Sequence, residues 1–192
     1  MDKSVLLIFL SDKDIPISSK VGNIINHEYP YKEYLNAIEP YLVKHKSYKP
    51  NLVIDCAHGA AFKIAAQIFP HLSSKLTFIG CEPDGVNINH HFGSESLDNL
   101  IKSVHSHKAD LGIAFDGDAD RIALVDDKGE KVDGDALLAL MAIYRQQQHK
   151  LNNNTIIANT MSGLALDKAL SSYRINVLRS DVGDRYVAEK MR

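Results

Sequence analysis

The sequence predicts an α/β fold: a three-layer α/β/α domain built on a mixed sheet, followed by the beginning of a second similar domain. Short apolar runs alternate with longer amphipathic stretches, which is the order of strand and helix in α/β proteins. Glycine, proline, aspartate and asparagine separate these segments, and all four residue types favour turns. With 45% apolar residues in a chain of 192, the sequence can bury a sizeable core.

Residues 1–49 are expected to hold an N-terminal segment and a lead-in helix. Within residues 1–20, a short apolar run precedes polar residues and a proline, which indicates no more than a strand and a loop. Between residues 29 and 45, apolar side chains recur at every third or fourth position, as they do on one face of a helix. Pro40 lies inside this helix and predicts a kink or a break there.

Residues 50–151 are expected to form the first α/β domain. A compact apolar strand after Pro50 leads into a helix that ends at Pro70. A turn-rich segment, residues 80–89, separates the second strand from the second helix. The turn at residues 126–129 indicates a hairpin, so we expect one antiparallel excursion in a mostly parallel sheet. The expected strands are 51–55, 76–79, 112–115 and 122–125, and the expected helices are 60–69, 96–108 and 135–148.

Residues 152–192 repeat the strand and helix order and are expected to be the start of a second, incomplete α/β domain. The asparagines at 152–154 are polar and without periodicity, which is typical of a linker. An incomplete domain leaves apolar surface around residues 155–187, so we expect either partial disorder or association there. The expected strands are 155–158 and 176–179, and the expected helices are 162–170 and 184–192.

Composition and charge exclude several classes of protein. The net charge is −2 and basic residues are scattered, so the sequence lacks the electrostatic footprint of nucleic-acid binding. The early apolar run, residues 5–10, is far shorter than a membrane span, and no cleavage site follows it. We therefore expect a cytoplasmic protein with no nucleic-acid partner and no membrane partner. Its two cysteines are too few for a disulfide framework and are expected to be reduced thiols.

Three aspartates, Asp116, Asp118 and Asp120, alternate with small residues between two apolar runs. Two carboxylates about 5 Å apart repel by roughly 3 kcal/mol at an effective dielectric constant of about 20, so three in one loop favour a bound cation. Oxygen ligands without histidine or cysteine indicate Mg²⁺, Ca²⁺ or Mn²⁺ in preference to Zn²⁺. An EF-hand is excluded, because Arg121 stands where its glycine is required and Asp127 where its glutamate is required. Three solvated carboxylates without a ligand are the alternative.

Five segments of the chain carry a family resemblance. They are Val53–Ala60, Gly80–Asn89, Asp116–Arg121, Lys131–Asp135 and Val182–Val187. Together they resemble the α-D-phosphohexomutases, enzymes that move phosphate between the anomeric and primary hydroxyl groups of a hexose. Within that family, the resemblance is closest to the bacterial phosphoglucosamine mutases. The match extends over about residues 20–192, and the segments follow the family's order.

The resemblance implies a four-domain enzyme, an isomerase, of which this chain holds the second domain and the start of the third. It implies that Asp116, Asp118 and Asp120 bind Mg²⁺ and that Arg121 contacts phosphate oxygens. The substrate is then a hexose phosphate, with glucosamine 6-phosphate converted to glucosamine 1-phosphate. In the family, the first domain supplies a phosphoserine whose phosphate also binds the metal. A hard divalent cation suits this chemistry because phosphoryl transfer needs charge stabilisation on oxygens.

Other features leave alternatives open. The family's serine loop, sugar-recognition loop and phosphate-binding loop do not occur in the sequence, so we expect the chain to be inactive alone. Arg185 and Tyr186 follow a glycine at an expected helix start and are candidates for binding substrate phosphate; solvated side chains are the alternative. Arg121 has the alternative role of a surface arginine that balances the acidic loop. Alternative functions are a non-catalytic interaction module that retains the fold, phosphomannomutase or phosphoglucomutase specificity, and an independent phosphatase.

Overall fold

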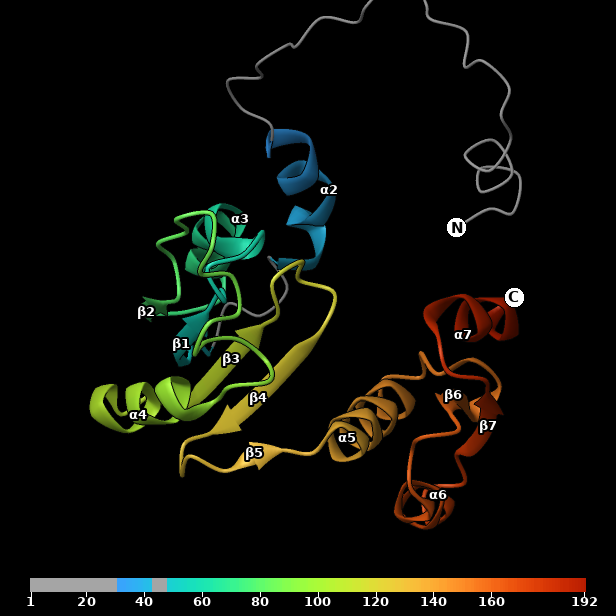
Figure 1. The fold of residues 1–192 in the computed structure, drawn as a ribbon. Coiled ribbons are helices and arrows are strands. Elements are labelled where there is room, and N and C mark those ends of the chain that lie inside the picture. Colours follow the sequence, from blue (N-terminus) through green and yellow to red (C-terminus); the bar gives the residue numbers. More distant parts are fainter. Residues whose placement is uncertain (1–30, 43–47) are drawn as a thin grey trace, which may run out of the picture. The chain divides into compact units, whose positions relative to one another are not determined.

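The computed structural model describes residues 31–42 and 48–192 of the chain, shown in Figure 1. The strand and loop expected within residues 1–20 lie outside the described residues. Helix α2 (Lys32–Leu42) falls inside the helix expected at 29–45, whose two ends are also outside the described residues. The helix continues through Pro40 to Leu42, so the proline does not break it.

A mixed sheet of five strands forms the centre of the first domain. The strands are β1 (Asn51–Asp55), β2 (Lys75–Ile79), β3 (Leu111–Phe115), β4 (Ile122–Asp126) and β5 (Lys131–Val132). They lie in the order β2-β1-β3-β4-β5, and β1 pairs in parallel with β2 and β3. β4 pairs antiparallel with β3, and β5 pairs antiparallel with β4. The hairpin expected at residues 126–129 is therefore confirmed as the pair β4–β5. The antiparallel pair β3–β4 is a second one, so the expectation of a mostly parallel sheet with one antiparallel excursion is wrong: two pairs are parallel and two are antiparallel.

Helices cover both faces of this sheet. α3 (Ala61–Ile68), which the short 3₁₀ helix η1 (Phe69–His71) follows, packs on one face. α4 (Asp98–His107) packs on the other face, where Leu100 and Val104 are fully buried against the sheet. Two helical layers around one sheet confirm the three-layer α/β/α architecture.

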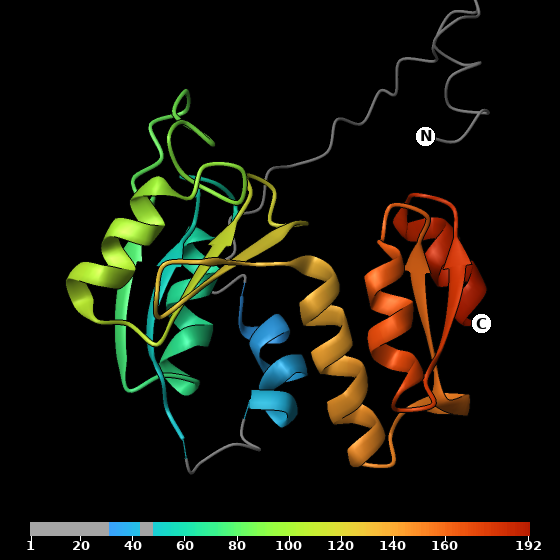
Figure 2. The ribbon, with the colours of Figure 1, turned by 90° about the horizontal axis from the view of Figure 1, so that it is seen from below.

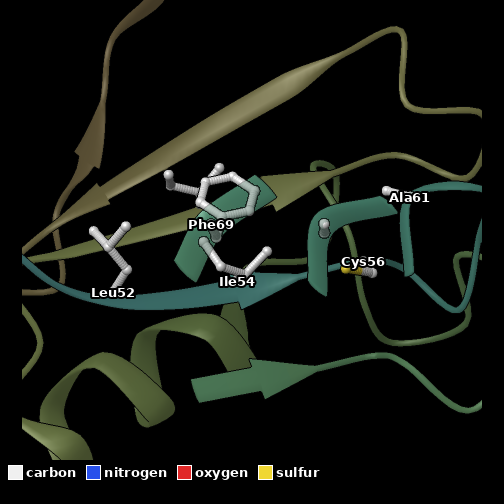
Figure 3. Packing of buried hydrophobic residues seen from close by; sticks show 7 residues of the cluster. Leu52, Ile54, Cys56, Ala61 and Phe69 are labelled. Atoms are coloured by element: carbon white, nitrogen blue, oxygen red, sulfur yellow. The ribbon is translucent and has the colours of Figure 1, made fainter. Parts of the chain in front are cut away.

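The central strand β1 explains how one short segment supplies both cores. Successive side chains of a strand point to opposite faces. Leu52 and Ile54 belong to the cluster with Ala61 and Phe69 on the α3 side, as Figure 3 shows, whereas Val53 belongs to the cluster with α4. The three consecutive apolar residues at the centre of β1, Leu52, Val53 and Ile54, therefore indicate burial on both faces.

The C-terminal part of the chain has its own core. Its elements are α5 (Gly134–Gln147), η2 (Asn152–Asn154), β6 (Thr155–Asn159), α6 (Leu164–Ser171), β7 (Asn176–Ser180) and α7 (Asp184–Met191). β6 and β7 form a parallel two-stranded sheet, with α6 on one side and α7 on the other (Figure 2). Ala139 and Ala142 of α5 pack in one cluster with Leu166 and Leu170 of α6.

The packing of α5 bears on the division of the chain into domains. The domain boundary predicted from the sequence, residue 151, assigns α5 to the first domain. Because α5 shares its buried side chains with α6 and β6, a boundary near Asp133 fits the packing better. The division at residue 151 stays a prediction.

Among the helices within residues 31–42 and 48–192, none combines the length and the apolar character that a membrane span needs. The cytoplasmic location stays a prediction.

Candidate metal centre

The three aspartates lie in the loop that joins β3 to β4. The antiparallel pairing of Phe115 with Ile122 closes this loop at its base. Within it, the backbone N–H of Ala119 donates to the carbonyl oxygen of Asp116 at 3.1 Å, and Ala119 adopts a left-handed φ of 62°. The turn brings one carboxylate oxygen of each of Asp116, Asp118 and Asp120 within 4.8 Å of the others. The clustering that the sequence predicts is therefore present.

The three carboxylates differ in their surroundings. Asp116 is buried, with 3% of its surface exposed, whereas Asp118 and Asp120 are exposed. A buried carboxylate that keeps its charge needs hydrogen-bond donors or a cation. The loop thus offers a metal one buried carboxylate ligand and two that face solvent.

Arg121 supplies the hydrogen-bond donors that the buried carboxylate of Asp116 needs. Its backbone N–H donates to Oδ1 of Asp116 at 2.9 Å, and its Nε donates to Oδ2 at 2.9 Å. The Nε atom also lies 3.8 Å from Oδ1 of Asp120. At the other end of the guanidinium, NH1 donates to Oε1 of Glu95 at 2.8 Å. The arginine therefore links the acidic loop to the segment that precedes α4.

These contacts separate the pKa values of two neighbouring carboxyl groups. Burial by itself raises the pKa of Asp116, but the hydrogen bonds from Arg121 outweigh it and hold that pKa well below its usual range. The hydrogen bond with Asp116 raises the pKa of Asp120, and burial and the charge of Asp118 act in the same direction. Asp116 is therefore ionised at neutral pH without any bound cation.

Backbone contacts hold the loop from behind. The N–H of Ala60, at the start of α3, donates to the carbonyl oxygen of Gly117 at 2.8 Å. Gly59 packs so closely on Gly117 that a Cβ at residue 59 would overlap the carbonyl oxygen. A Cβ at residue 117 would in turn lie 2.7 Å from Nδ2 of Asn89. Two glycines thus allow three loops to meet at the carboxylate cluster.

Asp55, the last residue of β1, fastens two of these loops. Its side chain is fully buried, Oδ1 accepts from the N–H of Ala57 at 2.8 Å, and Oδ2 accepts from the N–H of Gly93 at 2.8 Å. Burial raises the pKa of Asp55, while the two backbone donors lower it. Neither Asp55 nor Glu95 is among the site residues predicted from the sequence. The position of Asp55, a carboxylate at the end of a buried strand, is a signal that could have identified it; the sequence holds no comparable signal for Glu95.

Arg185 and Tyr186 lie at the start of α7, as expected, and both are exposed. Nε of Arg185 donates to Oε1 of Glu189 at 3.0 Å, one turn later on the same helix. Within the described part of the chain, neither residue forms a hydrogen bond or an ion pair with the acidic loop. Their contact with substrate phosphate stays a prediction.

An α/β domain that presents three clustered carboxylates at a strand end can hold a divalent cation near a substrate. Comparison with known proteins identifies the class. Residues 32–129 match phosphoglucomutase/phosphomannomutase α/β/α domain II, and residues 133–192 match domain III of the same family. The chain belongs to the phosphoglucomutase/phosphomannomutase family.

Among members of this family, the chain is similar to phosphoglucosamine mutases. The chain is 41% identical over 189 residues to a phosphoglucosamine mutase of Acetivibrio thermocellus, covering 98% of this chain and 42% of the relative. It is 48% identical over 144 residues to a phosphoglucosamine mutase of Zymomonas mobilis, covering 75% and 32%. The resemblance to phosphoglucosamine mutases is confirmed at this level. The chain spans about two fifths of the length of the first of these relatives.

Solved structures agree on the fold. A phosphoglucomutase/phosphomannomutase family protein of Burkholderia thailandensis superposes with a TM-score of 0.72 at 26% identity, covering 82% of this chain and 35% of that one. An N-acetylglucosamine-phosphate mutase of the α-D-phosphohexomutase superfamily has a TM-score of 0.61 at 17% identity, covering 82% and 39%. The second likeness concerns the fold alone. The α/β/α fold expected from the sequence is therefore that of the family.

Proposed function

We propose that this chain is part of a Mg²⁺-dependent phosphohexomutase that converts glucosamine 6-phosphate to glucosamine 1-phosphate, and that it supplies the metal-binding loop. The observation that carries the proposal is the convergence of Asp116, Asp118 and Asp120 in a chain whose relatives are phosphoglucosamine mutases. The substrate comes from the names of those relatives. Mannose and glucose phosphates are the alternative substrates within the family.

The donor set fits a hard divalent cation. All three candidate ligands are carboxylate oxygens, and Mg²⁺ and Ca²⁺ both prefer such ligands. Around octahedral Mg²⁺, adjacent ligand oxygens lie about 3.0 Å apart and opposite ones about 4.2 Å, so oxygens within 4.8 Å of one another need a contraction of up to about 2 Å to share one ion. Because Asp118 and Asp120 are exposed, their side chains are free to make it. When bound, the metal would stabilise negative charge on the oxygens of a transferring phosphoryl group.

Arg121 is proposed to hold the phosphate next to that site. A guanidinium has five N–H groups, and two of them donate to Asp116 and Glu95. The other three form no hydrogen bond within residues 31–42 and 48–192. Such a planar fork suits the oxygens of a phosphate. Arg121 thus has donors for the substrate while it orients Asp116.

The nucleophile is proposed to come from outside this chain. The sequence contains no Ser-His-Asn-Pro segment of the kind that carries phosphoserine in the family. We therefore infer that the chain binds Mg²⁺ but does not turn over sugar phosphate alone. The residues that this chain contributes would orient the metal and the phosphate.

Titration with Mg²⁺ tests the metal site. Binding is measured by calorimetry or from the amide resonances of the loop. We expect saturation at millimolar concentration or below, and at least tenfold weaker binding after Asp118→Asn. Asp127→Asn, an exposed aspartate in the β4–β5 turn, is the matched control and should leave the affinity unchanged. No saturation at millimolar Mg²⁺, or equal affinity of wild type and Asp118→Asn, would remove the metal role.

A coupled assay for glucosamine 1-phosphate tests the second half of the proposal. The chain alone should give no product above the background of buffer and substrate. Measurable turnover by the isolated chain would contradict the inference that the nucleophile lies elsewhere.

A further inference from the structure

Glu95 contacts the metal centre although it lies far from it in sequence. It stands 26 residues before Arg121, in the segment between the buried Ser94 and the start of α4. Its Oε1 accepts from NH1 of Arg121 at 2.8 Å, and its side chain is 78% exposed. Because little else surrounds this side chain, the contact with Arg121 is its main interaction.

Arg121 is consequently held at two points. Nε donates to Asp116 on one side, and NH1 donates to Glu95 on the other. An arginine held by one contact keeps much of its rotamer freedom, whereas two contacts at different nitrogens fix the plane of the guanidinium. The exposed fraction of the Arg121 side chain, 59%, shows that packing does not fix it.

The position of this guanidinium matters for a cation. Nε lies 3.8 Å from Oδ1 of Asp120, so a modest movement would bring the positive charge onto that candidate ligand. There it would compete with a divalent cation for Asp120, as it already contacts Asp116. A contact that draws the guanidinium away from Asp120 keeps the oxygens of that carboxylate accessible.

We propose that Glu95 is a positioning residue that acts on the metal site through Arg121. It holds NH1, so that Arg121 orients Asp116 without covering Asp120. The inference rests on the proposed Mg²⁺ site and goes beyond it, because it assigns a role to a side chain that is not itself a metal ligand. Loss of Glu95 should therefore weaken Mg²⁺ binding only while Arg121 is present.

A double-mutant cycle tests the inference, with Mg²⁺ alone as the probe. The affinity is measured by calorimetry for wild type, Glu95→Gln, Arg121→Gln and the double variant. We expect Glu95→Gln to weaken Mg²⁺ binding by about two- to fivefold, the range that an exposed ion pair supports. In the Arg121→Gln background, the same change should alter the affinity by less than about 1.5-fold at about 0.15 M salt, where distant charges are screened.

Glu130→Gln is the matched control, because Glu130 is exposed and its side chain forms no hydrogen bond or ion pair in the described part of the chain. It removes the same charge and should leave the affinity unchanged. A second cycle with Arg121→Lys keeps the test valid where Arg121→Gln perturbs the loop. Lysine retains the charge but lacks the planar fork, so Glu95→Gln should again have a reduced effect.

The outcomes separate the two proposals. Absence of Mg²⁺ binding in wild type would overturn the proposed function. Binding in wild type with an equal loss from Glu95→Gln in both backgrounds would overturn the positioning role, because Glu95 would then act as a simple charge. The side-chain Nε–H resonance of Arg121 gives an independent readout: its exchange with water should accelerate in Glu95→Gln, and unchanged exchange would contradict the proposal.

Discussion

Gly59→Ala should displace the acidic loop without changing any charge. A Cβ at residue 59 would overlap the carbonyl oxygen of Gly117 and would lie 2.7 Å from its Cα. These are backbone atoms, so they cannot turn aside as a flexible side chain can. Gly59 does not have a positive φ, so alanine brings no backbone strain and the overlap acts alone. Overpacking of this kind costs about 1–3 kcal/mol.

Urea denaturation measures the loss in free energy of unfolding, and Mg²⁺ titration measures the change in metal affinity. Since Gly117 lies between Asp116 and Asp118, we expect a lower free energy of unfolding together with weaker Mg²⁺ binding. Gly134→Ala is the matched control, because an added Cβ there meets no atom within 4 Å. The reasoning is refuted if Gly59→Ala leaves both the unfolding midpoint and the Mg²⁺ affinity unchanged.

Four further substitutions test the fold of the two domains and the expected association. Asp55→Asn should lower the free energy of unfolding by about 1–3 kcal/mol, because an amide cannot accept from both backbone N–H groups that the carboxylate binds; an unchanged urea midpoint would contradict this. Leu100→Ala, at a fully buried position, should cost about 2–5 kcal/mol in the same experiment, and a loss below 1 kcal/mol would argue against the packing of α4. Asp133→Ala removes the cap of α5 and should cost about 1 kcal/mol, with faster amide exchange confined to the first turn of that helix. Leu164→Gln, at a side chain that is 84% exposed, should reduce any self-association seen by sedimentation; equal association of the variant and wild type would place the contact elsewhere.

The sequence predicts most of the fold because its local signals agree. Each apolar run of the first domain becomes a strand within a residue or two of the expected bounds, since turn-forming residues end the runs on both sides. The antiparallel turn after Asp126 is also local, because the side chain of that residue accepts from the backbone N–H groups of Lys128 and Glu130. Short-range chemistry of this kind is readable without tertiary structure.

The remaining features depend on contacts between distant residues. Asp55 binds the backbone of a residue 38 positions away, and Glu95 binds an arginine 26 positions away. Neither pairing leaves a periodic pattern in the sequence. The helix α5 shows the same limit: its amphipathic pattern predicts a helix, but only the buried contacts of Ala139 and Ala142 show which core it joins. Local patterns therefore predict elements better than the partners of those elements.

The charge of the site gives an independent argument about activity. Asp116, Asp118, Asp120 and Glu95 are four carboxylates, and Arg121 is the one basic residue paired with them in the described part of the chain. A divalent cation would compensate two of the three remaining negative charges. A phosphate group then adds about 1.5–2 negative charges at neutral pH, so stable binding at this loop needs basic groups beyond Arg121. This charge balance supports the proposal that basic groups outside Asp116–Arg121 complete the phosphate site.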